Sequence, residues 1–457
     1  MSKNIIHITD NCAKGIFVDD MTDVKNLSYI LNKPIRQLIE EDDLLIFPHS
    51  LLDADDKIGD QTIGALTPID GKYKVQTGNI MGFVGKSETQ LHISSRFGSE
   101  KDDFFLYYML CQVHHINVFD MPYSQGNIAA LDLLILLFPY YLSNALQQGL
   151  YKEYRTFHHN DSNVRGVIDF NRHIQKNTPF QGNVAYHERV RSVDNALMHL
   201  IRHTIEYISK HPMGQALLQS DIDTRTYVAQ IQNATPSYSP TARAKVISEN
   251  LRPKVHPYYS EYRPLQQLCM QILRQEEVSL GENNEHTYGI LFDGAWLWEE
   301  YLASVLIKVG FVHPQNKLSK GYISLFTDNS GQRYPDFYHA KSKIVLDAKY
   351  KTLEHADKVS RIDRDDIHQV ISYMHVLSSN MGGVVFPSSI ESSTSPIQST
   401  LKGHGGTISL FSMHIPTADN WDDFIRQIKD IEFNLIQKFV QDYLNEEQKT
   451  NANLSKK

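Results

Sequence analysis

The spacing of apolar residues changes along the chain and divides it into three parts. Residues 1–125 contain short apolar runs separated by Gly, Asn, Asp and Pro, which is typical of strands joined by turns. Residues 126–285 contain longer stretches with apolar residues at helical spacing. Residues 286–445 combine both patterns, and the polar segment 446–457 predicts a disordered tail. The pattern predicts a multidomain α+β protein, with a β-rich N-terminal domain, a helical middle domain and an α/β C-terminal domain.

The first two parts differ in the elements that we expect. In the N-terminal part, strands are predicted around Phe17 and over residues 44–47, 80–84 and 91–93, and a short helix over 34–39. In the middle part, helices are predicted over 129–148 and 193–209. The basic, histidine-containing segment 151–177 is interpreted as a solvated helix face, with phosphate contact as the alternative. The polar residues 282–285 are the predicted linker to the last domain.

The C-terminal part has a regular succession of predicted elements. In chain order they are a helix over 295–309, a strand over 321–327, two short strands ending near residues 337 and 349, a helix over 363–377, strands over 382–386 and 407–411, and a helix over 422–444. We expect this part to form one sheet covered by helices.

Charge limits how the chain could bind DNA. The 457 residues carry a formal net charge of −8, and residues 1–60 contain 12 acidic and 6 basic side chains. A protein that binds DNA tightly on its own usually has a basic surface, because phosphate contacts supply much of the affinity. The N-terminal domain (1–125) is therefore expected to dock on a partner with a basic surface, with a solvated acidic surface as the alternative.

Cysteine usage and the absence of targeting signals indicate the compartment. Cys12, Cys111 and Cys269 are far apart and form no C-x-x-C pair, which argues for a reducing environment. The most apolar run, 133–142, is shorter than the roughly 20 residues of a membrane span, and no signal peptide is recognisable at the N-terminus. We expect a cytoplasmic protein.

The candidate chemistry lies on the two short strands of the last domain. Pro335-Asp336 and Asp347-Ala348-Lys349 are separated by a segment that fits a hairpin turning at residues 339–342. Because side chains two apart in a strand share a face, Asp347 and Lys349 should project together, with Asp336 beside them. Two carboxylates and an amine are what a hydrolytic Mg²⁺ site requires. The spacing resembles the PD-(D/E)xK nuclease core, and the order of elements is that of a restriction-endonuclease-like fold.

Two helices are expected to border this site. At 100° per residue, Glu299 lies on the edge of the apolar stripe of its helix, whereas Glu300 should point to solvent. Gln369 and Tyr373 flank the stripe of the second helix one turn apart.

Two other motifs are rejected as functional sites. Gly85-Lys86-Ser87 resembles the end of a phosphate-binding loop, but Ile80 occupies the position where that loop requires glycine. His199 and His203 have a metal-ligand spacing without the glutamate or third ligand that would complete a zinc site. The chain is therefore not expected to hydrolyse nucleotides itself.

Short fragments along most of the chain resemble the McrC family, the nuclease subunits of McrBC-type, 5-methylcytosine- or modification-dependent restriction systems. In the N-terminal half these fragments are residues 82–85, 149–154, 164–169 and 194–197; in the C-terminal half they are 297–301, 335–336, 347–351 and Gln369 with Tyr373.

The resemblance implies a partner, an oligomeric McrB-like AAA+ GTPase that recognises modified DNA and translocates. The chain itself would stimulate GTP hydrolysis and cut the DNA delivered by that partner. Asp336 and Asp347 would bind Mg²⁺ with the carbonyl of Ala348, helped by Glu299. Lys349 would act on the attacking water, and Gln369 and Tyr373 would orient the site or the DNA backbone.

Two alternatives stay open at this point. One is a PD-(D/E)xK nuclease of DNA repair or mobile-element processing that works without a GTPase. The other is a catalytically silent regulator that keeps the fold and only activates a motor.

Overall fold

The computed structural model describes residues 4–49, 52, 58–98, 103–116, 130–252, 256–278, 287–314, 321–353, 358–391, 396–403 and 405–442. The chain divides into two compact units: unit 1 comprises Met1–Leu133 and Gly281–Lys457, and unit 2 comprises Leu134–Leu280. This division differs from the three consecutive domains that the sequence predicted, because the first and last parts of the chain belong to one unit. The predicted linker at 282–285 and tail at 446–457 lie outside the described residues.

A strand from the C-terminal part completes the N-terminal sheet of unit 1. The sheet has the order β1-β7-β6-β11-β3. Its strands are β1 (Asn4–Thr9), β7 (Thr89–Ser94), β6 (Ile80–Lys86), β11 (Thr287–Asp293) and β3 (Asp43–Phe47). Strand β11 pairs antiparallel with β6 and parallel with β3, and all seven of its residues are buried. Removing β11 would therefore separate β3 from the other strands.

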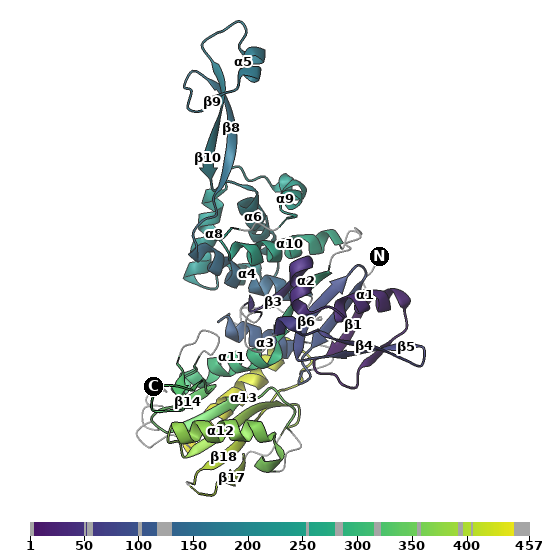
Figure 1. Ribbon diagram of the computed structural model, residues 1–457, viewed down its shortest axis with the longest axis vertical. Coiled ribbons are helices and arrows are strands. Elements are labelled where there is room, and N and C mark those ends of the chain that lie inside the picture. The colour runs from purple at the N-terminus through teal and green to yellow at the C-terminus, as the bar shows by residue number, and fades with distance from the viewer. Residues whose placement is uncertain are drawn as a thin grey trace. The chain divides into compact units, whose positions relative to one another are not determined.

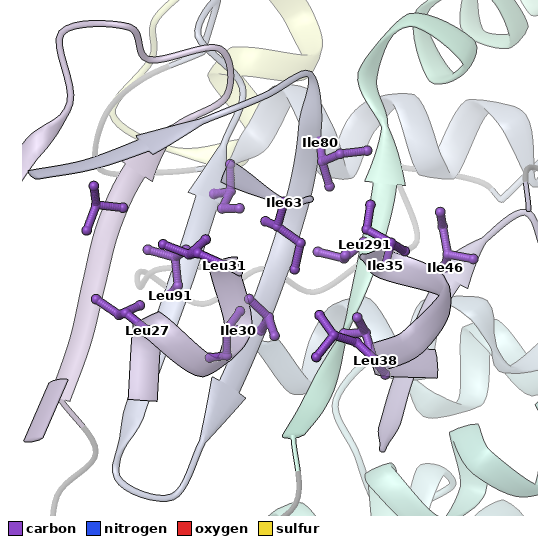
Figure 2. Close-up of a cluster of buried hydrophobic side chains, with 14 of the residues drawn as sticks. Leu27, Ile30, Leu31, Ile35, Leu38, Ile46, Ile63, Ile80, Leu91 and Leu291 are labelled. Carbon is purple, nitrogen blue, oxygen red and sulfur yellow. The ribbon is translucent and has the colours of Figure 1, made fainter. Parts of the chain in front are cut away.

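Two helices cover this sheet and bury its core. The Asp20 carboxylate caps α1 (Met21–Leu31) by accepting from Thr22 N and Asp23 N, and α2 (Ile35–Glu41) follows it. Leu27, Ile30 and Leu31 of α1 pack with buried residues of the sheet, including Leu291 of β11, as Figure 2 shows. The N-terminal part also forms a separate three-stranded sheet. Its strand order is β2 (Ile16–Val18), β5 (Lys72–Thr77) and β4 (Gly64–Ile69).

The second large sheet of unit 1 carries the predicted motif strands. Its order is β14-β15-β16-β18-β17, with β15, β16 and β18 parallel and the two edge strands antiparallel. The strands are β14 (Phe337–His339), β15 (Ile344–Ala348), β16 (Met381–Ser388), β18 (Thr407–His414) and β17 (Ile397–Thr400). The predicted strand over 321–327 does not join it: β12 (Ile323–Ser324) pairs only with β13 (Gln332–Arg333).

Helices cover both faces of this second sheet. They are α11 (Gly294–Leu306), continued by the 3-10 turn Ile307–Val309, α12 (Arg364–Val376) and α13 (Trp421–Asp442), while α3 (Phe104–Val113) packs against α11. Leu410 of β18 packs in the core cluster formed with α12, whereas its neighbour Phe411 lies 4.8 Å, between ring centroids, from Phe439 of α13. Because successive strand residues face opposite sides, α12 and α13 cover opposite faces of the sheet.

Unit 2 combines helices with a long hairpin. The helices are α4 (Ala130–Gln147), α5 (Phe170–Lys176), α6 (Ala196–Ile208), α7 (Gly214–Leu218), α8 (Ile222–Ala234), α9 (Arg243–Glu249) and α10 (Tyr262–Val278). Strand β8 (Glu153–Asp161) pairs along its whole length with β10 (Val184–Ser192), and the short β9 (Val167–Ile168) joins β10 (Figure 1). The prediction of a helix face over 151–177 is therefore wrong for most of that segment, and only α5 is helical.

Helix α4 is the one described helix whose length and composition would also fit a membrane span. Of its 18-residue window, 61% is buried inside the structure. Leu134, Leu137 and Phe138 are fully buried. These features are those of a core helix.

Candidate active site

The predicted site residues come from four elements of unit 1. Asp336 directly precedes β14, Asp347 lies within β15, and Lys349 follows β15. The apolar residues 344–346 bury β15 inside the sheet and carry Asp347 with them to full burial. Glu299 is on α11, and Gln369 and Tyr373 are on α12.

The hairpin brings the two aspartates together, as the sequence predicts. Phe337 pairs with Leu346 across β14 and β15, and the Asp336 carboxylate accepts a 2.6 Å hydrogen bond from Ala348 N. Burial, followed by the charge of Glu299, raises the pKa of Asp336 to about 7. Burial, followed by the charge of Asp336, raises the pKa of Asp347 to about 8. Both carboxyl groups therefore hold their protons more readily than ordinary aspartates, and their ionised forms require compensating positive charge.

Lys349 supplies the positive charge beside these carboxylates. Its Nζ lies 2.9 Å from Asp347 Oδ2 and 3.6 Å from Asp366 Oδ1. Burial on its own would lower the pKa of Lys349, but the charge of Asp347 outweighs burial and raises it. The lysine is therefore an ammonium group at neutral pH.

Gln369 and Tyr373 of α12 form a chain of hydrogen bonds to Lys349. Lys349 Nζ donates to Gln369 Oε1 at 3.2 Å, and Gln369 Nε2 donates to the Tyr373 hydroxyl at 3.1 Å. Tyr373 in turn donates to the Tyr334 carbonyl at 3.3 Å, two residues before Asp336. Helix α12 thus positions Lys349 through Gln369, and positions the backbone just before Asp336 through Tyr373.

Asp366 was not predicted as a site residue. Its carboxylate is buried and lies between two lysines, with Lys351 Nζ 2.7 Å from Oδ2 and Lys349 Nζ 3.6 Å from Oδ1. Its sequence signal is the i, i+3 spacing to Gln369, which places both side chains on the face of α12 that meets β15. Asp366 orients the amine that points at Asp347.

His313 is a second unpredicted neighbour of the site. It stacks on Phe337, its Nδ1 donates to the Asp336 carbonyl at 2.8 Å, and its Nε2 lies 3.9 Å from Glu299 Oε1 and 3.6 Å from Glu300 Oε1. Burial would lower the pKa of His313, but the hydrogen bonds to Glu300 and the Asp336 carbonyl and the charge of Glu299 raise it to about 9. His313 is therefore a cation that links α11 to the motif strand.

The expected difference between Glu299 and Glu300 needs correction. The Glu299 side chain is 31% exposed and that of Glu300 is 27% exposed, and both face His313. Glu300 does not point to open solvent because the segment carrying His313 covers that side of α11, which a helical projection cannot include. The two glutamates still differ, since the Glu299 charge acts on Asp336.

The oxygen donors of the site can be matched with the ligands that a hard divalent cation prefers. Among the described residues, no group of three or more His, Cys, Asp or Glu side chains has a metal-holding arrangement. Asp347 is fully buried, and its Oδ1 has no hydrogen-bond partner in the described part of the chain. An unsatisfied carboxylate oxygen next to a second, half-buried carboxylate is compatible with Mg²⁺, which often binds one or two carboxylates and keeps several waters. Asp336, Asp347 and the Ala348 carbonyl are the groups that would contribute to such a site.

The Gly85-Lys86-Ser87 segment and the His199–His203 pair have structural roles in the fold. Gly85 and Lys86 end β6 and lead through a tight turn into β7, so no helix N-terminus follows them. His199 Nε2 is hydrogen-bonded to the Asp194 carboxylate. His203 instead packs its ring 4.7 Å, between centroids, from Tyr238.

A family model matches residues 75–387, more than half of the chain, and its description is "McrBC 5-methylcytosine restriction system component". The chain belongs to this McrBC family. The matched residues include every element of the candidate site. No curated protein sequence matches the chain.

Two solved structures are similar to this McrBC-family chain. A chain of the half-complex from the tetradecameric assembly of Thermococcus gammatolerans McrB AAA+ hexamers with bound McrC has 16% identity and a TM-score of 0.50, covering 93% of this chain and 99% of that one. The Thermococcus gammatolerans McrBC complex contains a chain of 16% identity with a TM-score of 0.32, covering 67% and 88%. At 16% identity, the similarity to the first of these chains shows a shared fold.

Proposed function

We propose that this McrBC-family chain is the nuclease subunit of its restriction system and cleaves modified DNA by Mg²⁺-dependent phosphodiester hydrolysis. The observation that carries the proposal is the fully buried Asp347 next to the half-buried Asp336, with the Lys349 amine 2.9 Å from Asp347. They lie at the end of two strands in a helix-covered sheet, as a PD-(D/E)xK nuclease core requires.

Asp336, Asp347 and the Ala348 carbonyl are the groups that would hold the metal ion. When bound, Mg²⁺ would offset the charge of the scissile phosphate and favour hydroxide formation from a bound water. The two carboxyl groups must lose their protons before they can bind a cation. Because their pKa values are raised, the ionised carboxylates need nearby positive charge, which Lys349 and the cation together would supply.

The remaining residues position the reaction from the protein side. Lys349 can donate a hydrogen bond to the attacking water or to a phosphate oxygen, while Gln369 and Asp366 fix the direction of its amine. Glu299, held beside His313, is an additional acceptor that can orient a metal-bound or attacking water. Tyr373 supports Gln369 and, through the Tyr334 carbonyl, the start of the motif.

The proposal includes a partner, a McrB-like AAA+ GTPase, whose GTP hydrolysis the chain would stimulate in the cytoplasm. The family to which the chain belongs supports this, and the similar chain from Thermococcus gammatolerans is in a complex of McrB hexamers with bound McrC. The net charge of −8 also favours delivery of DNA by a partner over autonomous binding.

The test of this proposal separates cleavage from GTPase stimulation. Lys349→Ala is expected to reduce plasmid cleavage on the order of 100-fold or more, because the amine beside Asp347 is lost from the reaction centre. The same variant should stimulate GTP turnover fully when mixed with the purified McrB-like GTPase. Cleavage with GTP and Mg²⁺, and GTP turnover at saturating subunit, are the two measurements.

The outcomes distinguish the alternatives. Cleavage by the chain without any GTPase would favour a repair or mobile-element nuclease. GTPase stimulation by a wild-type protein that never cuts DNA would favour the catalytically silent regulator. Failure of a folded Lys349→Ala protein to stimulate GTP hydrolysis would contradict the assignment of the two activities to different surfaces.

The two adjacent glutamates provide a matched pair of variants. Glu299→Gln is expected to slow cleavage about tenfold or more, because its charge acts on Asp336 and its carboxylate borders the site. Glu300→Gln should slow it less than about threefold, since Glu300 reaches the site only through His313. Single-turnover cleavage rates at saturating Mg²⁺ measure both, and equal effects would contradict the role given to Glu299.

The far end of the hairpin in unit 2 is a candidate surface for docking on the GTPase. Large apolar side chains around β9 and α5 are exposed, notably Val167, Phe170, Ile174 and Phe180. A group of exposed apolar side chains on one short segment is typical of a protein interface. We propose that this group contacts the GTPase ring, together with or in place of the acidic N-terminal region (1–125) that the sequence suggested.

Phe170→Ser tests this contact. Phe170 is 70% exposed, so the change should hardly alter the melting temperature, yet it should weaken binding to the GTPase about tenfold or more if the ring inserts into a pocket of the partner. Ile222→Ser is the control, because Ile222 is 72% exposed on α8 of the same unit. Equal affinities of the two variants, measured by titration of GTP turnover, would exclude this surface.

A further inference from the structure

A buried arginine outside the motif connects the N-terminal sheet of unit 1 to the candidate site. Arg96 follows β7, and its side chain is only 12% exposed. Its Nη1 lies 3.2 Å from Asp10 Oδ2 and donates to Asn79 Oδ1 at 3.2 Å, while its backbone N–H donates to Asp10 Oδ1 at 2.7 Å. Nη2 donates to the backbone carbonyl of Tyr350. One guanidinium group thus joins three separate segments of the chain.

The contact with Tyr350 fixes the end of the motif strand. Tyr350 directly follows Lys349 and is buried, with its hydroxyl hydrogen-bonded to Ser95 Oγ at 2.7 Å. The Arg96 guanidinium lies 4.7 Å from the Tyr350 ring centroid, and the Phe97 ring packs against the same ring at 5.0 Å. On the other side, Lys349 N donates to the Val385 carbonyl at 3.0 Å. The backbone on both sides of the Lys349 side chain is therefore held.

The contact with Asn79 reaches the helix that carries Glu299. Asn79 accepts from Arg96 through its side chain and, through its backbone carbonyl, from Gly294 N at 3.1 Å. Gly294 is the first residue of α11, and a Cβ at this position would lie 2.8 Å from Cε1 of Tyr350. Glycine is therefore required there, because the helix start and the Tyr350 ring are in direct contact. Arg96 donates hydrogen bonds to Asn79, which holds the start of α11, and to the backbone of Tyr350, whose ring contacts Gly294.

We propose that Arg96 is a positioning residue that sets the spacing between β15 and α11, and so the placement of Asp347 and Lys349 relative to Glu299. This inference rests on the proposed nuclease function. A buried ion pair such as Arg96 with Asp10 contributes little net stability, and its value lies in the geometry that it imposes. The planar, multidentate guanidinium is suited to three acceptors in fixed directions, which a lysine ammonium on a flexible stem cannot reproduce. A shift of about 1 Å at a reaction centre can cost on the order of 100-fold in rate.

Arg96→Lys in the full chain is the decisive variant, because it keeps a positive charge for the buried Asp10 carboxylate. We expect kcat for plasmid cleavage, measured with the GTPase and GTP present, to fall about tenfold or more with KM for DNA within about twofold. Hydrogen–deuterium exchange should rise in peptides covering 294–300 and 347–351 and stay unchanged in β18. Arg36→Lys is the control, since Arg36 donates to the Leu52 carbonyl elsewhere in the same unit.

The two readouts separate this proposal from the proposed function. Unchanged exchange in both peptides, or an unchanged kcat, would overturn the role of Arg96. If the wild-type protein failed to cut DNA, the nuclease assignment would fall, while the exchange measurement would still decide whether Arg96 holds β15 and α11. Tyr350→Phe provides a second variant that retains the ring and removes the bond to Ser95. It is expected to raise exchange in 347–351 with a smaller loss of kcat.

Discussion

Replacing Asp347 by asparagine is expected to abolish DNA cleavage and to leave the protein folded. Asp347 is fully buried at the centre of the candidate site, and an amide of the same shape fits its space. A neutral amide is a poor ligand for Mg²⁺ in an all-oxygen site, so the variant should lose the metal with the activity. Plasmid cleavage in the presence of the GTPase, and Mg²⁺ binding by calorimetry, measure the two losses.

The pH dependence of stability gives this prediction an independent control. The pKa of Asp347 in the folded protein is raised to about 8 from about 4 in the unfolded chain, so the wild-type fold loses stability progressively as the pH rises from 4 to 8. Asparagine cannot ionise. In metal-free buffer, the melting temperature of Asp347→Asn should therefore match that of wild type near pH 4 and exceed it by a growing margin as the pH rises to 8.

Asp365→Asn is the matched substitution for the activity measurement. Its side chain is 84% exposed on the first turn of α12, so removing its charge should leave cleavage near the wild-type rate. Near-normal cutting by Asp347→Asn in Mg²⁺, or an equal loss in Asp365→Asn, would contradict the metal site assigned here.

The core of the site could be predicted because its geometry is local. Asp336, Asp347 and Lys349 lie within one hairpin, whose turn and two-residue period fix which side chains meet. Gln369 and Tyr373 follow from the period of one helix. Asp366 lies on the same helix, so its spacing to Gln369 was an available signal. His313 could not be predicted in the same way, because its role depends on how separate elements pack.

The hairpin of unit 2 was missed for a related reason. Both faces of β8 are largely exposed, so the segment lacks the apolar and polar alternation that marks a half-buried strand. Its basic and histidine side chains resemble those of a solvated helix. The run Tyr154-Arg155-Thr156-Phe157 is rich in residues that favour strands and was the available signal.

The domain boundary was missed because strand pairing between distant segments leaves no local pattern. The apolar run of β11 predicts a buried strand but does not indicate which sheet it enters. Here it pairs with β6 and β3, more than 200 positions earlier in the chain. A chain cut at the predicted boundary would therefore lose the strand that joins β3 to the rest of the sheet.

In a fragment of residues 1–285, the N-terminal sheet is consequently expected not to fold, whereas unit 2 is present in full. It lacks β11, whose Tyr288, Ile290, Leu291 and Phe292 are buried in the sheet. Burial of a large apolar side chain contributes about 1.5–3 kcal/mol, so four such residues approach the roughly 5–15 kcal/mol that stabilises a whole domain. We expect a fragment whose remaining thermal transition is that of unit 2 and which fails to stimulate the GTPase, measured by circular dichroism and GTP turnover.

Co-expression with residues 286–457 is the control, since that fragment supplies β11 in trans. The two fragments should co-purify, unfold cooperatively and recover GTPase stimulation, because strand pairing and core packing require no covalent connection at residue 285. A cooperative transition of the N-terminal sheet in 1–285 alone, together with full stimulation of GTP hydrolysis, would instead mean that this sheet is stable without β11. In that case the N-terminal and C-terminal parts of unit 1 would be separate domains, as their sequence patterns suggest.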